Sequence, residues 1–124
     1  MGEAAKLRPL VWIGSSKADF LKFPDDVKDL VGYALYVAQQ GGKHPDAKPL
    51  AGFGGAGTLE VVTDHRGDTF RTVYTVRLAG RVYVLHAFQK KSKSGIRTPK
   101  AEIDLVKTRL RRAETEHSDS LPRR

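Results

Sequence analysis

Residues 69–89, TFRTVYTVRLAGRVYVLHAFQ, decide the fold. They contain two runs of β-branched and aromatic residues, 70–78 and 82–89, and the Ala-Gly pair between the runs predicts a tight turn. An alternating segment at 59–64 precedes these runs, and turn residues at 66–68 connect it to them. The connections are too short for a crossover helix, so the stretch predicts three strands in an antiparallel meander.

Further elements are predicted on both sides of this meander. A strand-like apolar run at 10–13 opens the chain, and helices are predicted over 16–23 and from Pro24 to the glycines at 41–42. A Thr-Pro pair at 98–99 opens a last helix with one apolar stripe. The predicted fold class is α+β with the order β-α-α-β-β-β-α. We expect the helices to pack on one face of a small antiparallel sheet and the other face to meet solvent.

Length and composition indicate how many domains the chain can form and which cellular compartment it occupies. The chain has 124 residues, enough for a single domain, which we place at residues 1–113 with a polar, frayed C-terminal tail at 114–124. It has no cysteine, which excludes disulfides and thiolate metal sites and fits a reducing compartment. No apolar run reaches the roughly 20 residues of a membrane helix. These features predict a cytoplasmic protein with no membrane partner.

The net positive charge of the chain is confined to one segment. No acidic residue occurs between Asp68 and Glu102, and the cations of this interval account for the whole formal net charge of +8. They are Arg71, Arg77, Arg81, Lys90, Lys91, Lys93, Arg97 and Lys100. A concentrated positive field attracts polyanions, so we predict an RNA-binding face in preference to a surface kept basic for solubility.

The histidines offer acid–base chemistry near this segment. Four are present, but none stands at metal-ligand spacing from another, so we predict no metal and no cofactor. His65 lies beside a predicted turn and His86 lies within the last predicted strand. Imidazole exchanges protons near neutral pH, although a lone histidine is more often structural. A catalytic and a structural role both stay open for these two residues.

The segments 69–76, 82–93 and 98–103 together resemble the phage-derived branch of the RelE/HigB toxins, in the RelE/ParE superfamily. The string His-Ala-Phe-x-Lys-Lys-Ser-Lys at 86–93, followed by the Thr-Pro pair, carries the resemblance. It implies a RelE-like fold and the toxin of a type II toxin–antitoxin system. It also implies a metal-independent endoribonuclease, an mRNA interferase that acts in the ribosome and inhibits translation. The implied partners are a cognate helix-turn-helix antitoxin, mRNA and ribosomal RNA.

The resemblance also implies roles for individual residues. Arg71 matches a strand arginine that contacts the scissile phosphate. Lys91 matches a basic residue that protonates or stabilises the leaving 5′-oxygen after attack by the ribose 2′-hydroxyl. The strand before Arg71 has no lysine where RelE has its general base, so His65, Arg66 or His86 are candidates for that role. The residues expected to bind RNA or the ribosome are Arg66, Lys90, Lys93 and Arg97.

Two other functions stay open on the sequence alone. A ParE-like toxin would share the fold and inhibit gyrase without cutting RNA. A phage remnant would bind RNA without catalysis. The cations at positions 71, 90, 91 and 93 favour the ribonuclease, because ParE proteins usually lack the full catalytic set.

Overall fold

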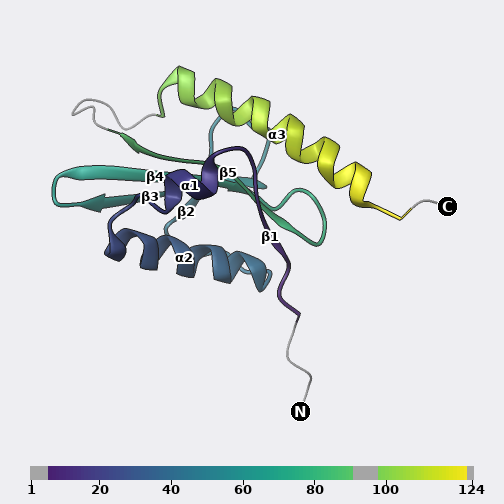
Figure 1. Cartoon of the computed structure of the whole chain (residues 1–124), viewed down its shortest axis with the longest axis horizontal. Helices are drawn as coiled ribbons and strands as arrows, with labels where there is room; N and C mark the ends of the chain where they lie inside the picture. Colours follow the sequence, from purple (N-terminus) through teal and green to yellow (C-terminus); the bar gives the residue numbers. More distant parts are fainter. Residues whose placement is uncertain (1–5, 91–97, 123–124) are drawn as a thin grey trace, which may run out of the picture.

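One five-stranded sheet with helices on it makes up the protein in the computed structural model, which describes residues 6–90 and 98–122 (Figure 1). In chain order the elements are β1 (Leu10–Trp12), α1 (Ser16–Phe20), α2 (Asp25–Gln39), β2 (Ala47–Pro49), β3 (Thr58–His65), β4 (Asp68–Thr75), β5 (Val82–Lys90) and α3 (Lys100–Ser120). The strand order is β1-β5-β4-β3-β2, with β1 parallel to β5 and the other pairs antiparallel. The α+β class is confirmed, although the sheet is mixed rather than purely antiparallel.

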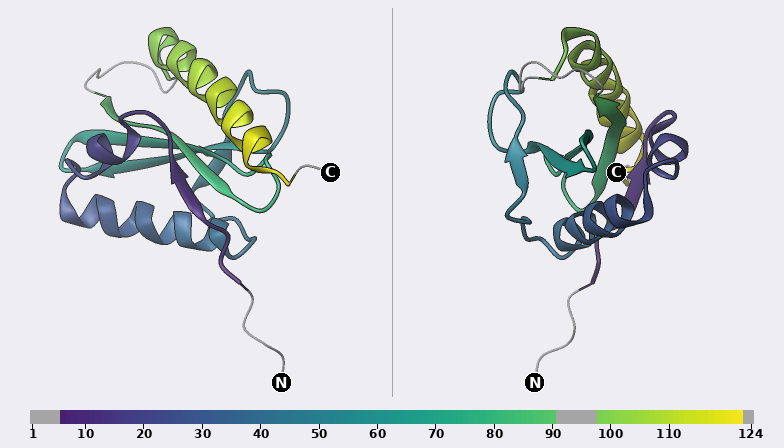
Figure 2. Two further views of the ribbon diagram at one scale, coloured as in Figure 1. Left: turned by 45° about the vertical axis from the view of Figure 1, so that its right-hand side comes forward. Right: turned by 90° about the vertical axis from the view of Figure 1, so that its left-hand side faces the viewer.

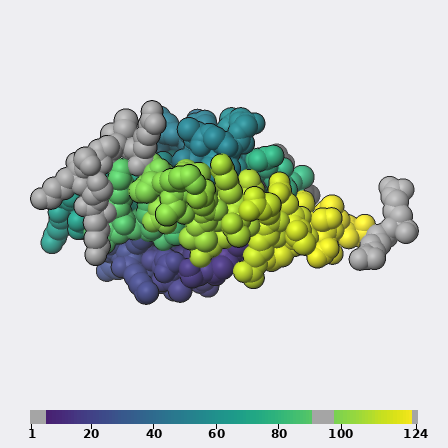
Figure 3. Space-filling model, turned by 90° about the horizontal axis from the view of Figure 1, so that it is seen from above, coloured from purple at the N-terminus to yellow at the C-terminus, as the bar shows by residue number. Residues whose placement is uncertain are grey.

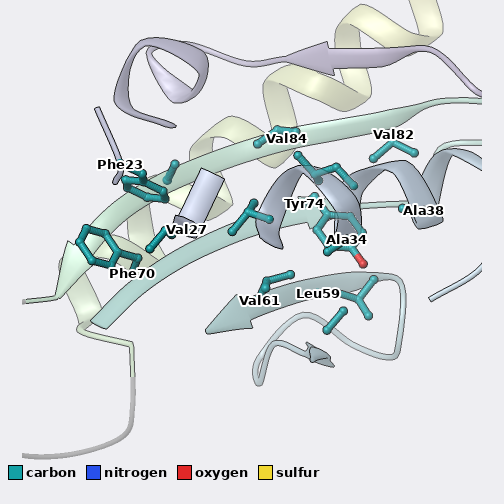
Figure 4. Packing of buried hydrophobic residues seen from close by; sticks show 14 residues of the cluster. Phe23, Val27, Ala34, Ala38, Leu59, Val61, Phe70, Tyr74, Val82 and Val84 are labelled. Atoms are coloured by element: carbon teal, nitrogen blue, oxygen red, sulfur yellow. The ribbon is translucent and has the colours of Figure 1, made fainter. Parts of the chain in front are cut away.

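The helices α2 and α3 lie on opposite faces of the sheet (Figures 1 and 2). Beneath α2, Val27 and Val31 pack with Val61 and other strand residues in a large apolar cluster (Figure 4). On the other face, Val106 of α3 packs with Tyr83 of β5. The prediction that helices cover one face and leave the other to solvent is therefore wrong. Both faces of the sheet carry apolar side chains. One face buries the apolar stripe of α2 and the other buries that of α3.

The hairpin that joins β3 to β4 fixes which side chains share a face. It is closed by His65 and Asp68, and its two turn residues, Arg66 and Gly67, have φ angles of 50° and 86°. Two consecutive positive φ angles are what a type I′ turn requires. The resulting register places Val62 opposite Arg71. A shift of one residue would send every side chain of the strand to the other face.

Two parts of the chain are more regular than predicted. Strand β2 lies where the sequence predicted no strand, between α2 and β3, and it pairs antiparallel with β3. Helix α3 continues to Ser120, so the frayed tail expected from residue 114 is wrong over residues 114–120. The Tyr83 hydroxyl lies 3.1 Å from Nδ1 of His117, and Arg81 donates to the Ser120 hydroxyl at 2.6 Å. These contacts hold the end of the helix beside the start of β5.

The length of α3 gives it a prominent place on the molecular surface. Seen from above, it runs across the molecule from the green to the yellow part of the chain (Figure 3). Among the described helices, none combines the length and the apolarity needed to cross a membrane.

Candidate active site

Charged side chains gather on the α3 face of the sheet, near the start of α3. Arg71 of β4 lies between Val62 of β3 and Phe88 of β5, and the next row on the same face is Glu60, Val73 and His86. The alternation of side chains along a strand puts all of these residues on one side. The three middle strands therefore bring a guanidinium, a carboxylate and an imidazole together.

Arg71 and Glu60 form a buried ion pair. Nη1 of Arg71 donates to Oε1 of Glu60 at 2.9 Å and to the Thr98 hydroxyl at 3.3 Å, and the Thr98 hydroxyl donates to Oε2 of Glu60. The exposed fractions of the two charged side chains are 6% and 11%. A lone buried cation is costly, so an arginine within an apolar strand is expected to point to an open face. That expectation is wrong, because Glu60 compensates the charge and α3 covers the same face.

His86 is engaged at both of its ring nitrogens. Nε2 lies 2.8 Å from Oε1 of Glu102, and Nη1 of Arg109 lies 3.4 Å from Nδ1. A guanidinium can only donate, so Nδ1 accepts this contact and the proton of the neutral ring lies on Nε2, facing Glu102. The ring also stacks on Phe88, with centroids 4.7 Å apart. His86 is thus held in one orientation and one tautomer.

Arg109 connects α3 to β5 and to α1. Its Nη1 donates to the Leu85 carbonyl oxygen at 3.0 Å, and its Nη2 donates to the Ser15 hydroxyl at 2.9 Å. The Ser15 hydroxyl in turn donates to Oδ2 of Asp19 at 2.7 Å. Burial lowers the pKa of the Arg109 guanidinium, whereas the charge of Asp19 raises it. An arginine pKa starts so high that the group keeps its charge in either case.

Two of the other predicted site residues lie away from this cluster. His65 and Arg66 lie at the tip of the β3–β4 hairpin, and neither is among the residues bonded to Arg71 within the described parts of the chain. Lys90 ends β5 and is largely buried. The predictions for Lys91, Lys93 and Arg97 fall outside the described residues. Within residues 6–90 and 98–122, no group of three or more His, Asp or Glu side chains could hold a metal ion.

Four residues of the cluster were not predicted from the sequence, namely Glu60, Thr98, Glu102 and Arg109. A signal for Glu60 was available. A two-residue turn at 66–67 places Val62 opposite Arg71, and Glu60 is then the diagonal neighbour of Arg71 on the same face. No such signal exists for Glu102 and Arg109, because their contacts depend on how α3 lies on the sheet.

This fold and cluster define a small α+β domain that holds paired charges under its last helix. The chain belongs to the family of the phage-derived protein Gp49-like (DUF891), whose model matches residues 18–111. The predicted membership of a phage-derived branch is confirmed by this match.

A solved structure is also similar to the chain. It is a chain in the crystal structure of the toxin–antitoxin complex RelBE2 from Mycobacterium tuberculosis, with 18% sequence identity and a TM-score of 0.45. The similarity covers 69% of the present chain and 94% of the other. Among curated proteins, none matches the chain.

Proposed function

We propose that the chain is the toxin of a type II toxin–antitoxin system and that it cleaves mRNA in the ribosome without a metal ion. The observation that carries this proposal is the buried Glu60–Arg71 pair, with His86 and Glu102 beside it on the same face. Membership of a phage-derived family supports it, as does the resemblance of segments 69–76 and 82–93 to RelE/HigB toxins. The cytoplasm, a helix-turn-helix antitoxin and ribosomal RNA belong to the same proposal.

The proposed reaction is an internal transfer at one phosphodiester. Glu60 takes the proton of the ribose 2′-hydroxyl, the 2′-oxygen bonds to phosphorus, and the bond from phosphorus to the 5′-oxygen breaks. Negative charge builds on the phosphorane, and the guanidinium of Arg71 stabilises it. Lys91, the basic residue that the resemblance implies for this role, returns a proton to the 5′-oxygen. The products are a 2′,3′-cyclic phosphate and a free 5′-hydroxyl, so no water or further reactant is consumed.

Access to Arg71 is part of the proposal. The side chain is largely buried, and the Thr98 hydroxyl bonds to both members of the pair. A phosphate that binds Nη1 of Arg71 displaces the Thr98 hydroxyl from this donor. In exchange, the phosphate oxygens accept hydrogen bonds from a guanidinium that Glu60 already holds in place, which lowers the cost of orienting it.

The test is expression of the chain followed by mapping of RNA 5′-ends. The wild type should arrest growth and generate new ends that carry a 5′-hydroxyl. Arg71→Lys and Glu60→Gln should each lower cleavage by about 100-fold, the usual loss when one preorganised donor or base is removed. Arg77→Lys is the matched control, because Arg77 is exposed and lies outside this face.

Thermal unfolding of each variant shows whether it is folded. Undiminished cleavage by folded Arg71→Lys would overturn the site assignment. Growth arrest by the wild type without new RNA ends, together with loss of DNA supercoiling activity, would instead identify a ParE-like gyrase inhibitor.

A further inference from the structure

An open pocket lies between α1 and the second half of β5. Its volume is about 320 Å³. It begins where β1 ends, because β1 pairs with β5 only as far as Val84 and no other described strand covers that edge. Phe23 and Phe70 line it with their rings edge to face, 5.0 Å between centroids, and they lie together at one end of the α2 cluster (Figure 4). The volume is at the lower end of small-molecule sites and suits one planar heterocycle.

An aromatic stack lines the pocket on the side of the candidate active site. Phe88 and His86 both line it, with an interplanar angle of 22°. His86 is buried, but Phe88 is partly exposed, so a ligand meets its ring. Unpaired bases of single-stranded RNA are commonly held by stacking on aromatic side chains, at about 1–3 kcal/mol per base.

The rim of the pocket is polar and carries both signs of charge. It is formed by Asp19, Lys22 and Gln89. Oδ2 of Asp19 accepts the Ser15 hydroxyl, and within the described residues Oδ1 has no partner. A carboxylate oxygen accepts only, so it matches a base with an amino group: adenine, cytosine or guanine. Uracil has no amino group, and its one N–H donor, N3–H, lies between two carbonyl oxygens that a carboxylate repels. Lys22 is exposed and can pair with the phosphate of the same nucleotide.

We propose that this pocket binds one unpaired, amino-bearing nucleobase of an RNA. The base stacks on Phe88 and donates from its amino group to Asp19, while Lys22 pairs with its phosphate. This inference rests on the proposed ribonuclease function and adds a sequence preference to it. The pocket is also connected to the candidate active site, because Asp19 is bonded to Ser15, which is bonded to Arg109, which contacts His86.

The experiment is a titration of the full chain with AMP, CMP, GMP and UMP, followed by NMR of the backbone amides. Binding of the first three should shift the amide signals of Lys22, Phe88 and Gln89, with UMP at least about 10-fold weaker, as one good hydrogen bond predicts. Phe88→Leu should weaken all four nucleotides by about 10-fold or more. Asp19→Ala should abolish the discrimination against UMP. Asp26→Ala, an exposed acid on α2, is the control and should change nothing.

The proposal is overturned if no monophosphate shifts these signals, or if UMP binds the wild type as tightly as the others. It is also overturned if only a protein segment occupies the pocket. If RNA is cleaved with the same site preference by the wild type and by Asp19→Ala, the proposed base-binding pocket is overturned but the proposed ribonuclease function is not. If nucleotides bind with the expected preference but no RNA is cleaved, the proposed ribonuclease function is overturned but the base-binding pocket is not.

Discussion

Arg71 shows how a charge can be held stably in the interior of a proposed active site. A buried ion pair gains little net stability over apolar residues of the same volume, but removal of one partner typically costs about 3–5 kcal/mol. Because Glu60 and Thr98 hold the guanidinium, it is oriented before any substrate arrives. For the same reason we expect a change at Arg71 to affect both the stability and the proposed activity. Arg71→Lys keeps the charge beside Glu60, so it tests the proposed activity with less loss of stability than Arg71→Ala.

The burial of the Tyr74 hydroxyl predicts how the free energy of unfolding changes at alkaline pH. It is 1% exposed, its hydroxyl has no hydrogen-bond partner within the described residues, and burial raises its pKa to about 12. A raised folded-state pKa gives stability that is complete below the ordinary value of 10.0 and is lost as the pH rises towards 12. We expect Tyr74→Phe to abolish this loss and, at neutral pH, to raise the free energy of unfolding by about 1 kcal/mol.

Urea unfolding at neutral pH and across this alkaline range measures both effects. Tyr36→Phe is the control, because Tyr36 is exposed on α2. Lower stability of Tyr74→Phe at neutral pH would mean that the hydroxyl makes a hydrogen bond after all.

At the scale of elements, α3 is anchored to the sheet by polar contacts as well as by its apolar stripe. Arg109→Gln removes the hydrogen bonds from α3 to the Leu85 carbonyl and to Ser15. Since hydrogen bonds to charged groups contribute about 1.5–3 kcal/mol each, we expect the loss of both to lower the free energy of unfolding, measured in urea, by about 3 kcal/mol. Arg112→Gln on the same helix removes only an exposed pair with Glu116 and should cost at most about 0.5 kcal/mol. Equal losses in the two variants would contradict the anchoring role of Arg109.

The sequence predicts the elements of this fold better than their arrangement. Strand periods and turn residues suffice for the existence of β3, β4 and β5, and the two-residue turn fixes the register of β3 against β4. The register of β4 against β5 shifts between Val73 and Tyr74, and no turn residue predicts that shift. The apolar stripe of α3 shows that the helix packs on a surface, but not which face of the sheet it covers. Strand β2 has only three residues, too few to show a period. The part of the site contributed by Glu102 and Arg109 could not be predicted, because it depends on helix docking.

At the scale of the molecule, the concentration of positive charge predicts how RNA binding responds to salt. Lys91→Ala together with Lys93→Ala should reduce the slope of log affinity against log salt by about 1.4, since each phosphate contact on a single strand contributes about 0.7. The control is Lys43→Ala with Lys48→Ala, which lowers the net charge by the same amount at two exposed positions outside the acid-free segment. It should leave most of the slope of log affinity against log salt unchanged. Filter binding of a short RNA across a salt series measures both slopes. Identical slopes in the two double variants would show that the effect follows total charge, not its location.

The parallel pairing of β1 with β5 has a consequence for the timing of synthesis. The edge strand is made first, but its partner comes from the last strand of the chain, and Ile13 can bond to the Val84 carbonyl only after β5 has left the exit tunnel. Contacts so distant in sequence form late, because a long loop must close before they contribute any stability. The complete sheet, with the strands that hold Glu60, Arg71 and His86, therefore cannot assemble before β5 has left the exit tunnel. A molecule proposed to attack translation would thus lack its active shape while its own first strands are being translated.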